Sequence, residues 1–131
     1  MPDVSTVLNA KAAIARHIQW KITLQLAITM QEPLSAHHVN QILHFRQCAI
    51  GQWLDSTATL LMRATPQYAD LMRKHIEFHR EMKRIADLIA GASYEDAARG
   101  ISPSSSFMRS SKALANAVMA YDAMAAIAVP A

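Results

Sequence analysis

Apolar residues recur at steps of three and four along most of this chain, and this spacing predicts one buried face on each of several α-helices. The first predicted helix runs over about residues 7–30 and ends before Pro33, because the proline ring and its missing N–H are incompatible with a continuing helix. One stripe of this helix is predicted to face the core, and it consists of His17, Trp20, Leu24 and Ile28.

Two further helices are predicted in the middle of the chain. The second covers about residues 36–53, with Ser35 as its N-cap. The third begins with Pro66 in its first turn, behind Thr65 as the cap, and ends at Gly91. It is the most regular of the helices, because its core positions recur every seven residues at Tyr68, His75, Met82 and Ile89.

The C-terminal third predicts a short helical turn and one more long helix. The turn covers residues 93–99, where Ser93 and Asp96 have the spacing of a capping box. Ser102 and Pro103 then open the last helix, whose inward positions are Phe107, Leu114, Val118, Tyr121 and Ala125. Short connections of this kind predict an all-α, up-and-down four-helix bundle with a short extra helix, in which residues 1–131 form a single domain.

Composition supports a packed helical domain, since 52% of the 131 residues are hydrophobic, 18% are charged and only three are glycine. The formal net charge is +3, but the basic residues do not cluster with aromatic residues, so no nucleic-acid partner is expected. No signal peptide opens the chain, and the apolar segment 113–131 is interrupted by Asn116 and Asp122, so no membrane association is expected. A single cysteine excludes an intramolecular disulfide, and we expect a cytoplasmic protein.

Two histidines interrupt the apolar face of the third helix. His75 and His79 are one turn apart, within reach of a single ion, and buried imidazoles require partners for their nitrogens. His17 on the first helix and Cys48 on the second would complete a tetrahedral zinc set closed to substrate. From the residues alone, separately buried histidines and a cysteine that acts as a small hydrophobe remain an equal alternative.

Three short motifs favour the zinc set over separately buried residues. The segments His-Ile-Gln-Trp (17–20), Cys-Ala-Ile-Gly-Gln-Trp (48–53) and His-Ile-Glu-Phe-His (75–79) closely resemble the HxxW, CxxGxW and HxxxH signatures of the chemoreceptor zinc-binding domain family. The resemblance extends over almost the whole chain, and CxxGxW is its most specific part. It implies a four-helix bundle with a short extra helix, and zinc ligands that carry over to His17, Cys48, His75 and His79.

The resemblance also implies a role. Members of this family are attached to bacterial chemoreceptors and diguanylate cyclases, which they regulate in response to zinc or hypochlorous acid, and homodimers are common among them. This chain carries no such output domain. We expect either a stand-alone sensory module, which the Met1 start and the loose Ala-Val-Pro-Ala end favour, or a sensor excised from a longer protein. It is expected to respond to zinc or oxidant through Cys48 and to relay to a chemotaxis or cyclic-di-GMP signalling partner.

Other histidines and one glycine lie near these motifs. His44 precedes Cys48 by one turn and could compete as a ligand, but the family pattern does not use its position, so we expect it at the surface or beside the ligands. His37 and His38 are expected to be solvated. Gly51 allows either a close approach of two helices near the metal or a helix end.

Three other functions are weighed against zinc sensing. A zinc protease needs HExxH, whereas Glu77 lies midway between His75 and His79, and a cysteine ligand closes the site, so no enzymatic activity is expected. A di-iron bundle of the hemerythrin type needs ExxH carboxylates, and no acidic residue precedes a histidine by three positions. A purely structural, zinc-stabilised helical dimerisation module is the alternative that the sequence leaves open.

Overall fold

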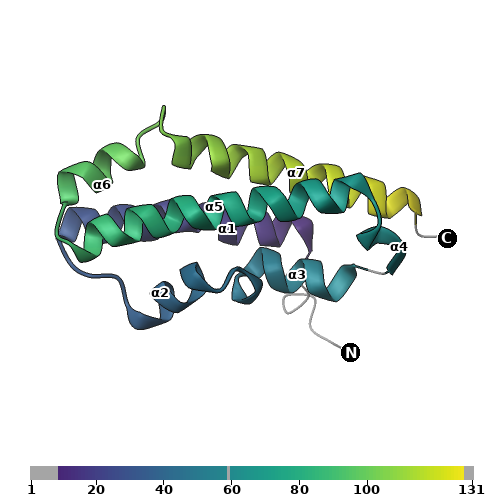
Figure 1. Ribbon diagram of the computed structural model, residues 1–131, viewed down its shortest axis with the longest axis horizontal. Helices are drawn as coiled ribbons and strands as arrows, with labels where there is room; N and C mark the ends of the chain where they lie inside the picture. The colour runs from purple at the N-terminus through teal and green to yellow at the C-terminus, as the bar shows by residue number, and fades with distance from the viewer. Residues whose placement is uncertain (1–8, 59, 129–131) are drawn as a thin grey trace.

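Helices account for almost the whole of the chain in the computed structural model, which describes residues 9–58 and 60–128 (Figure 1). Within this part of the chain there is no β-strand. The predicted all-α class is therefore confirmed. In order, the elements are α1 (Ala10–Met30), α2 (Ala36–Leu43), the 3-10 turn η2 (Phe45–Gln47), α3 (Ala49–Thr57), α4 (Leu60–Arg63), α5 (Pro66–Ala90), α6 (Tyr94–Gly100) and α7 (Ser106–Ala128).

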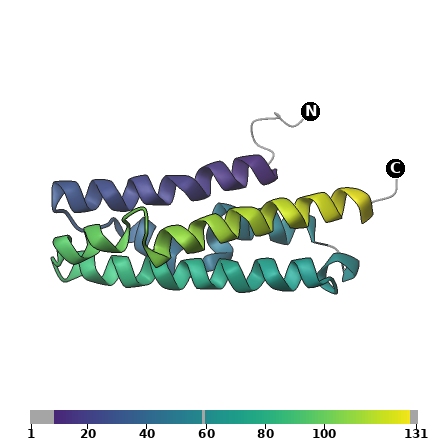
Figure 2. The same cartoon turned by 90° about the horizontal axis from the view of Figure 1, so that it is seen from above.

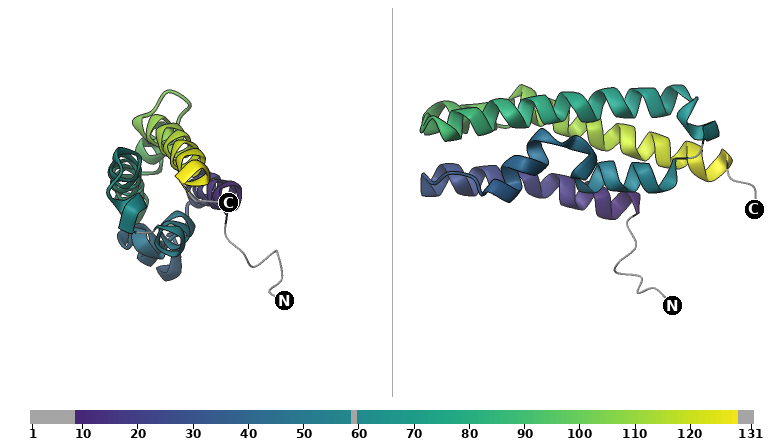
Figure 3. Two further views of the ribbon diagram at one scale, coloured as in Figure 1. Left: turned by 90° about the vertical axis from the view of Figure 1, so that its right-hand side faces the viewer. Right: turned by 60° about the horizontal axis from the view of Figure 1, so that its bottom comes forward.

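Four columns of helix surround the core. Seen end-on, α1, α5, α7 and the broken pair α2–α3 occupy the four corners of a bundle (Figure 3). Successive columns run in opposite directions, as short connections require (Figure 2). The most extensive packing joins α5 to α7, while α1 packs against both α3 and α7, and α2 packs against α5. The helix α6 contacts α5 and α1 at one end of the bundle.

The predicted starts of α2 and α5 and the predicted end of α5 are confirmed. The side chain of Ser35 accepts a hydrogen bond from the N–H of His38, and that of Thr65 accepts one from the N–H of Tyr68. These bonds satisfy backbone donors that the first turn of a helix leaves unpaired. The helix α5 ends at Gly91, as expected.

The prediction of one continuous helix over residues 36–53 is wrong. The helix α2 stops early, η2 follows, and α3 begins only after Cys48, whose backbone is extended. Gly51 permits this break, since a Cβ built on it would lie 2.4 Å from the carbonyl oxygen of Phe45 and 2.7 Å from Cα of Arg46. The turn η2 thus folds directly onto the first turn of α3, and only glycine leaves room for it there.

The expectations for the C-terminal third are corrected in two places. Ser93 occupies the N-cap position of α6, but its side chain makes no capping hydrogen bond. The helix α7 begins at Ser106 rather than at 102–103, because Ser105 accepts the N–H of Met108 and residues 102–105 form turns. The short α4 was not predicted, and positions 7 and 8 of the first predicted helix lie outside the described residues.

The core fills the space between the four columns, and the predicted inward stripe of α1 is buried throughout. Among the described residues no helix is both long and apolar enough to cross a membrane. The largest side chains enclosed by the core come from all four columns and include Leu24, Leu54, Phe78, Phe107 and Tyr121. Polar side chains are rare in this core, and the buried ones are His17, His75 and His79 among the described residues.

Candidate metal centre

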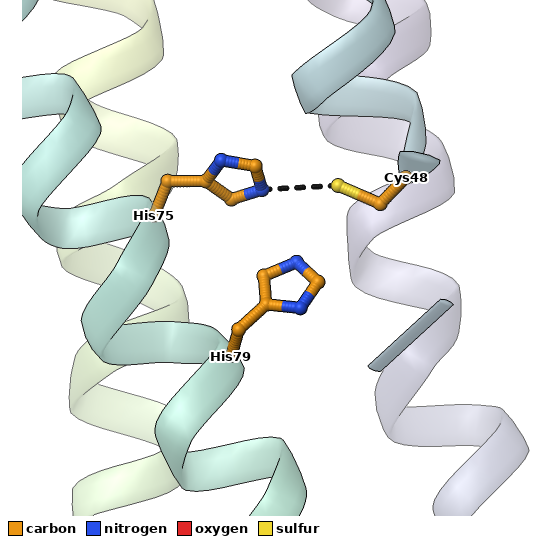
Figure 4. A group of neighbouring side chains, drawn as sticks. All are labelled: Cys48, His75 and His79. Atoms are coloured by element: carbon orange, nitrogen blue, oxygen red, sulfur yellow. Dashed lines mark hydrogen bonds between the residues drawn. The ribbon is translucent and has the colours of Figure 1, made fainter. Parts of the chain in front are cut away.

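One thiol and two imidazoles meet in the core near the middle of the bundle. Cys48, His75 and His79 each offer a ligand atom, and these three atoms lie within 4.8 Å of one another. The Sγ atom of Cys48 is 3.0 Å from Nε2 of His75 (Figure 4). The three residues are only 6%, 1% and 5% exposed, respectively. Such a group of donors is able to hold a metal ion that is shielded from bulk water.

Helix α5 places both histidines on one face because residues four apart lie one above the other. Their ring centroids are 4.7 Å apart, and both rings point from α5 toward the column that carries Cys48 (Figure 4). Glu77, which lies between them in the sequence, is exposed on the opposite side of α5. Its carboxylate therefore takes no part in the cluster.

Cys48 reaches the cluster because the chain turns sharply just before it. It is the N-cap residue of α3, so its side chain lies at the start of that helix. Burial raises the pKa of the Cys48 thiol, while the backbone N–H groups of Gly51, Ile50 and Cys48 act in the opposite direction. A bound cation would add to the effect of these N–H groups and favour the thiolate.

The break after α2 also supplies a partner for His79. Its Nδ1–H donates to the carbonyl oxygen of Ile42 at 2.9 Å, which leaves Nε2 as the nitrogen with a free lone pair. In a continuous helix that carbonyl would accept the N–H of Arg46. Sequence reasoning missed this contact, since every residue has a carbonyl and only the tertiary fold shows which one is free.

His17 is buried in α1, but its ring is turned toward α7. Its Nε2 lies 3.1 Å from Oγ and 3.4 Å from the carbonyl oxygen of Ser111, and its ring packs edge-on against Phe78. His17 lies outside the group of three donors described above. Its role as the fourth ligand stays a prediction, and it would need to move its ring toward the other three.

The buried histidines are held in the neutral form that binds metals. Burial lowers the pKa of His17 from 6.5 to about 4 and that of His75 to about 3, and mutual repulsion with His79 adds to both effects. Burial also lowers the pKa of His79. Near neutral pH all three rings are therefore uncharged and have a lone pair to offer.

The donor set fits zinc. Two imidazoles and a thiolate are ligands that zinc prefers, and in a tetrahedral site they lie about 3.3–3.7 Å from one another. The three donors here are within reach of that spacing. Nδ1 of His75 is buried and has no hydrogen-bond partner among the described residues. A cation shared by Nε2 and Sγ of Cys48 would fix this ring from its Nε2 side.

A pocket of about 310 Å³ opens beside the cluster and is bordered by Cys48, His79 and His17. Four glutamines, one each from α1, α2, η2 and α3, line part of the rest, and none of the described lining residues is acidic. His38, expected to be solvated, is instead half-buried, with its ring packed against Trp20 at the pocket wall. His37 and His44 are exposed, as expected.

One comparison with known proteins agrees with a zinc site. The sequence model of the chemoreceptor zinc-binding domain matches residues 17–86. This segment makes up more than half of the chain and contains all three motifs. No curated protein and no solved structure gives a match. With a buried cysteine and two buried histidines at the family's motif positions, in an all-helical bundle, the chain belongs to the chemoreceptor zinc-binding domain family.

Proposed function

We propose that this chain is a regulatory module in which zinc is bound by Cys48, His75, His79 and His17, and in which Cys48 responds to zinc supply or to oxidant. The observation that carries the proposal is a buried thiol that lies 3.0 Å from an imidazole and lines a pocket that opens to the surface. A purely structural ligand would gain nothing from such access. A sensing thiol requires it, because a small reactant has to reach the sulfur.

In this proposal the residues have different tasks. Zinc, when bound, supplies a positive charge that stabilises the Cys48 thiolate. His75 and His79 come from one helix and are set by its rigid geometry, whereas Cys48 comes from the break between η2 and α3. The cysteine is therefore the ligand on the element that can move most easily. Its release would leave the histidines able to retain the ion.

The oxidant in the proposal is hypochlorous acid. The Cys48 thiolate takes the oxygen atom and becomes a sulfenic acid, sulfur loses two electrons, and chlorine gains them and leaves as chloride. The chain has no second cysteine, so no internal disulfide can follow, and an outside thiol must reduce the product. The uncharged amides and the absence of acidic residues around the pocket favour entry of an uncharged or anionic oxidant.

The output would be passed on by contact, in the cytoplasm, to a signalling protein of the chemoreceptor or diguanylate cyclase type. Self-association is part of the proposal. The residues Ile18, Ile22, Leu26 and Met30 form one ridge along α1, and each is more than half exposed. A ridge at four-residue spacing can pack into the matching groove of a second copy, and a two-fold dimer is the commonest closed arrangement.

Metal analysis tests the zinc site directly. The protein purified without chelator should contain one zinc per chain, and Cys48→Ala or His75→Ala should each lose most of it, because the remaining donors cannot close a tetrahedron. His44→Ala is the matched control and should keep its zinc, since His44 is exposed. Wild-type protein with negligible zinc would contradict the proposal.

Graded hypochlorous acid then separates a sensor from a structural zinc module. A sensor should show Cys48 oxidised and zinc coordination altered by mass spectrometry before the eight methionines are consumed, with the helix content retained by circular dichroism. If Cys48 stays intact while methionines oxidise, the oxidant proposal is wrong. Loss of most helix on removing zinc with a chelator would favour the structural alternative.

A further inference from the structure

The hydrogen bond between His17 and Ser111 is the longest-range tie to the buried histidines, since it joins α1 to α7 across 94 positions of the sequence. Both Oγ and the carbonyl oxygen of Ser111 lie within hydrogen-bond distance of Nε2 of His17. The carbonyl oxygen can only accept, so Nε2 donates to it when it carries the proton, and this is the tautomer that we assign. A neutral imidazole has one N–H, and the lone pair of His17 is therefore on Nδ1.

His79 shows the same arrangement with the nitrogens exchanged. Its Nδ1–H donates to the carbonyl oxygen of Ile42, and its Nε2 is left to bind an ion. A histidine that ligates a metal commonly donates its second N–H to a carbonyl or carboxylate, which fixes both the tautomer and the ring orientation. His17 and His79 thus each have one nitrogen tethered by a separate column of the bundle and the other nitrogen free.

We propose that Ser111 is a positioning residue of the zinc centre, which holds His17 through Nε2 so that Nδ1 is the metal-binding nitrogen. This inference rests on the proposed zinc function and on His17 as the fourth ligand. Ser111 lies outside residues 17–86, the segment that the family model matches. Zinc binding therefore reaches α7 through a residue beyond the recognised motifs, and it connects α7 to the columns that carry Cys48, His75 and His79.

The packing of His17 supports this role. The ring is 4% exposed and lies 4.2 Å, centroid to centroid, from Phe78, so a rotation that reversed its nitrogens would require repacking of the core. The helices α1 and α7 also lie in direct contact, so the hydrogen bond does not depend on a flexible loop. The tether and the packing select the same orientation of the two nitrogens, which the ring keeps if it shifts toward the other three donors.

Three variants test the proposal, with zinc affinity measured by competition against a chromophoric chelator. Ser111→Ala should weaken zinc binding about 10-fold, at the low end of the effect of losing such a partner, because the backbone carbonyl remains. Ser111→Thr keeps a hydroxyl and should bind as the wild type does. Ser110→Ala, at the neighbouring position of α7, is the matched control and should also be unchanged. Circular dichroism should show the same helix content in all four proteins.

Nitrogen-15 NMR of the histidine rings gives a readout that needs no variant. In the zinc-loaded wild type, His17 should be protonated on Nε2 and metal-bound through Nδ1, whereas His79 should show the opposite assignment. Metal on Nε2 of His17, or equal affinities for Ser111→Ala and Ser110→Ala, would overturn the role of Ser111 and leave the zinc proposal intact. Wild-type protein that binds no zinc would contradict both.

Discussion

Gly51 is the residue on which the position of Cys48 depends most directly. The carbonyl of Phe45 and the backbone of Arg46 occupy the space that a side chain at position 51 would need. This contact explains the glycine of the CxxGxW motif by a steric requirement, since the turn before the cysteine has to fold onto the helix after it. Of the two interpretations left open by the sequence, a close approach is the one observed, and it is between neighbouring segments of one column.

Gly51→Ala should therefore destabilise the protein by about 1–3 kcal/mol, the usual cost of overpacking, and should weaken zinc binding by displacing Cys48. Gly91→Ala is the matched control. A Cβ there would lie 3.5 Å from the carbonyl oxygen of Asp87, an ordinary contact, so stability should change little. Urea unfolding and zinc titration of both variants check the prediction. Equal stability of the two would mean that η2 can move away without cost.

At the scale of single elements, the ends of the helices determine the geometry of the site more than their middles do. The break between α2 and α3 frees the Ile42 carbonyl for His79 and places Cys48 at a helix start. The end of α5 contains a different feature, because Ala92 has a φ of 58° and so occupies the left-handed region that favours glycine. Gly91, directly before it, has an ordinary negative φ.

Ala92→Gly should stabilise the protein by about 0.5–1 kcal/mol, since glycine adopts this conformation without the steric cost that alanine meets. Ala90→Gly is the control from the last turn of the same helix, and it should destabilise by up to about 1 kcal/mol. Thermal unfolding of the metal-free proteins measures both. A loss of stability in Ala92→Gly would show that the greater entropy of the unfolded chain outweighs the strain that is removed.

At the scale of the whole molecule, three buried histidines make the stability of the bundle sensitive to pH. The pKa values of His17 and His75 are about 4 and about 3 in the folded protein, compared with 6.5 ordinarily. Between these values and 6.5 the unfolded chain binds protons that the folded chain does not. Stability is therefore fully present above pH 6.5 and is lost as the pH falls toward 4.

The metal-free protein should lose on the order of 1–2 kcal/mol per buried histidine between pH 7 and pH 5. Urea unfolding at several pH values measures this loss, and His75→Leu should show a smaller pH dependence than the wild type. The exposed His44 provides the control, since His44→Ala should leave the pH dependence of the unfolding free energy unchanged. If the midpoint of urea unfolding does not change with pH, the rings can be protonated in the folded state at little cost in free energy.

The exposed ridge of α1 gives a second prediction at this scale. If the ridge forms the dimer interface, Leu26→Glu should give a monomer in light scattering at micromolar concentration, because a charge would be buried there without a partner. Met119→Glu, an exposed apolar position on α7, is the control and should leave the mass unchanged. Wild-type protein of monomer mass would contradict the dimer.

The sequence by itself determined the three long helices α1, α5 and α7, the caps at Ser35 and Thr65, and the pairing of His75 with His79. These features depend on residues within a turn or two of each other, so periodicity and local propensity are sufficient to predict them. The motif around Cys48 was recognisable for the same reason, since its members are at most five positions apart.

Only the tertiary structure decided how these pieces form a site. The break before Cys48 was not predictable from helix propensity, because it arises from packing of η2 on Gly51 rather than from a helix-breaking residue in segment 44–48. The partners of His79 and His17, a backbone carbonyl and Ser111, are 37 and 94 positions away. Hydrogen bonds over such separations depend on which columns become neighbours, and that is fixed by burial of the whole core rather than by any local pattern.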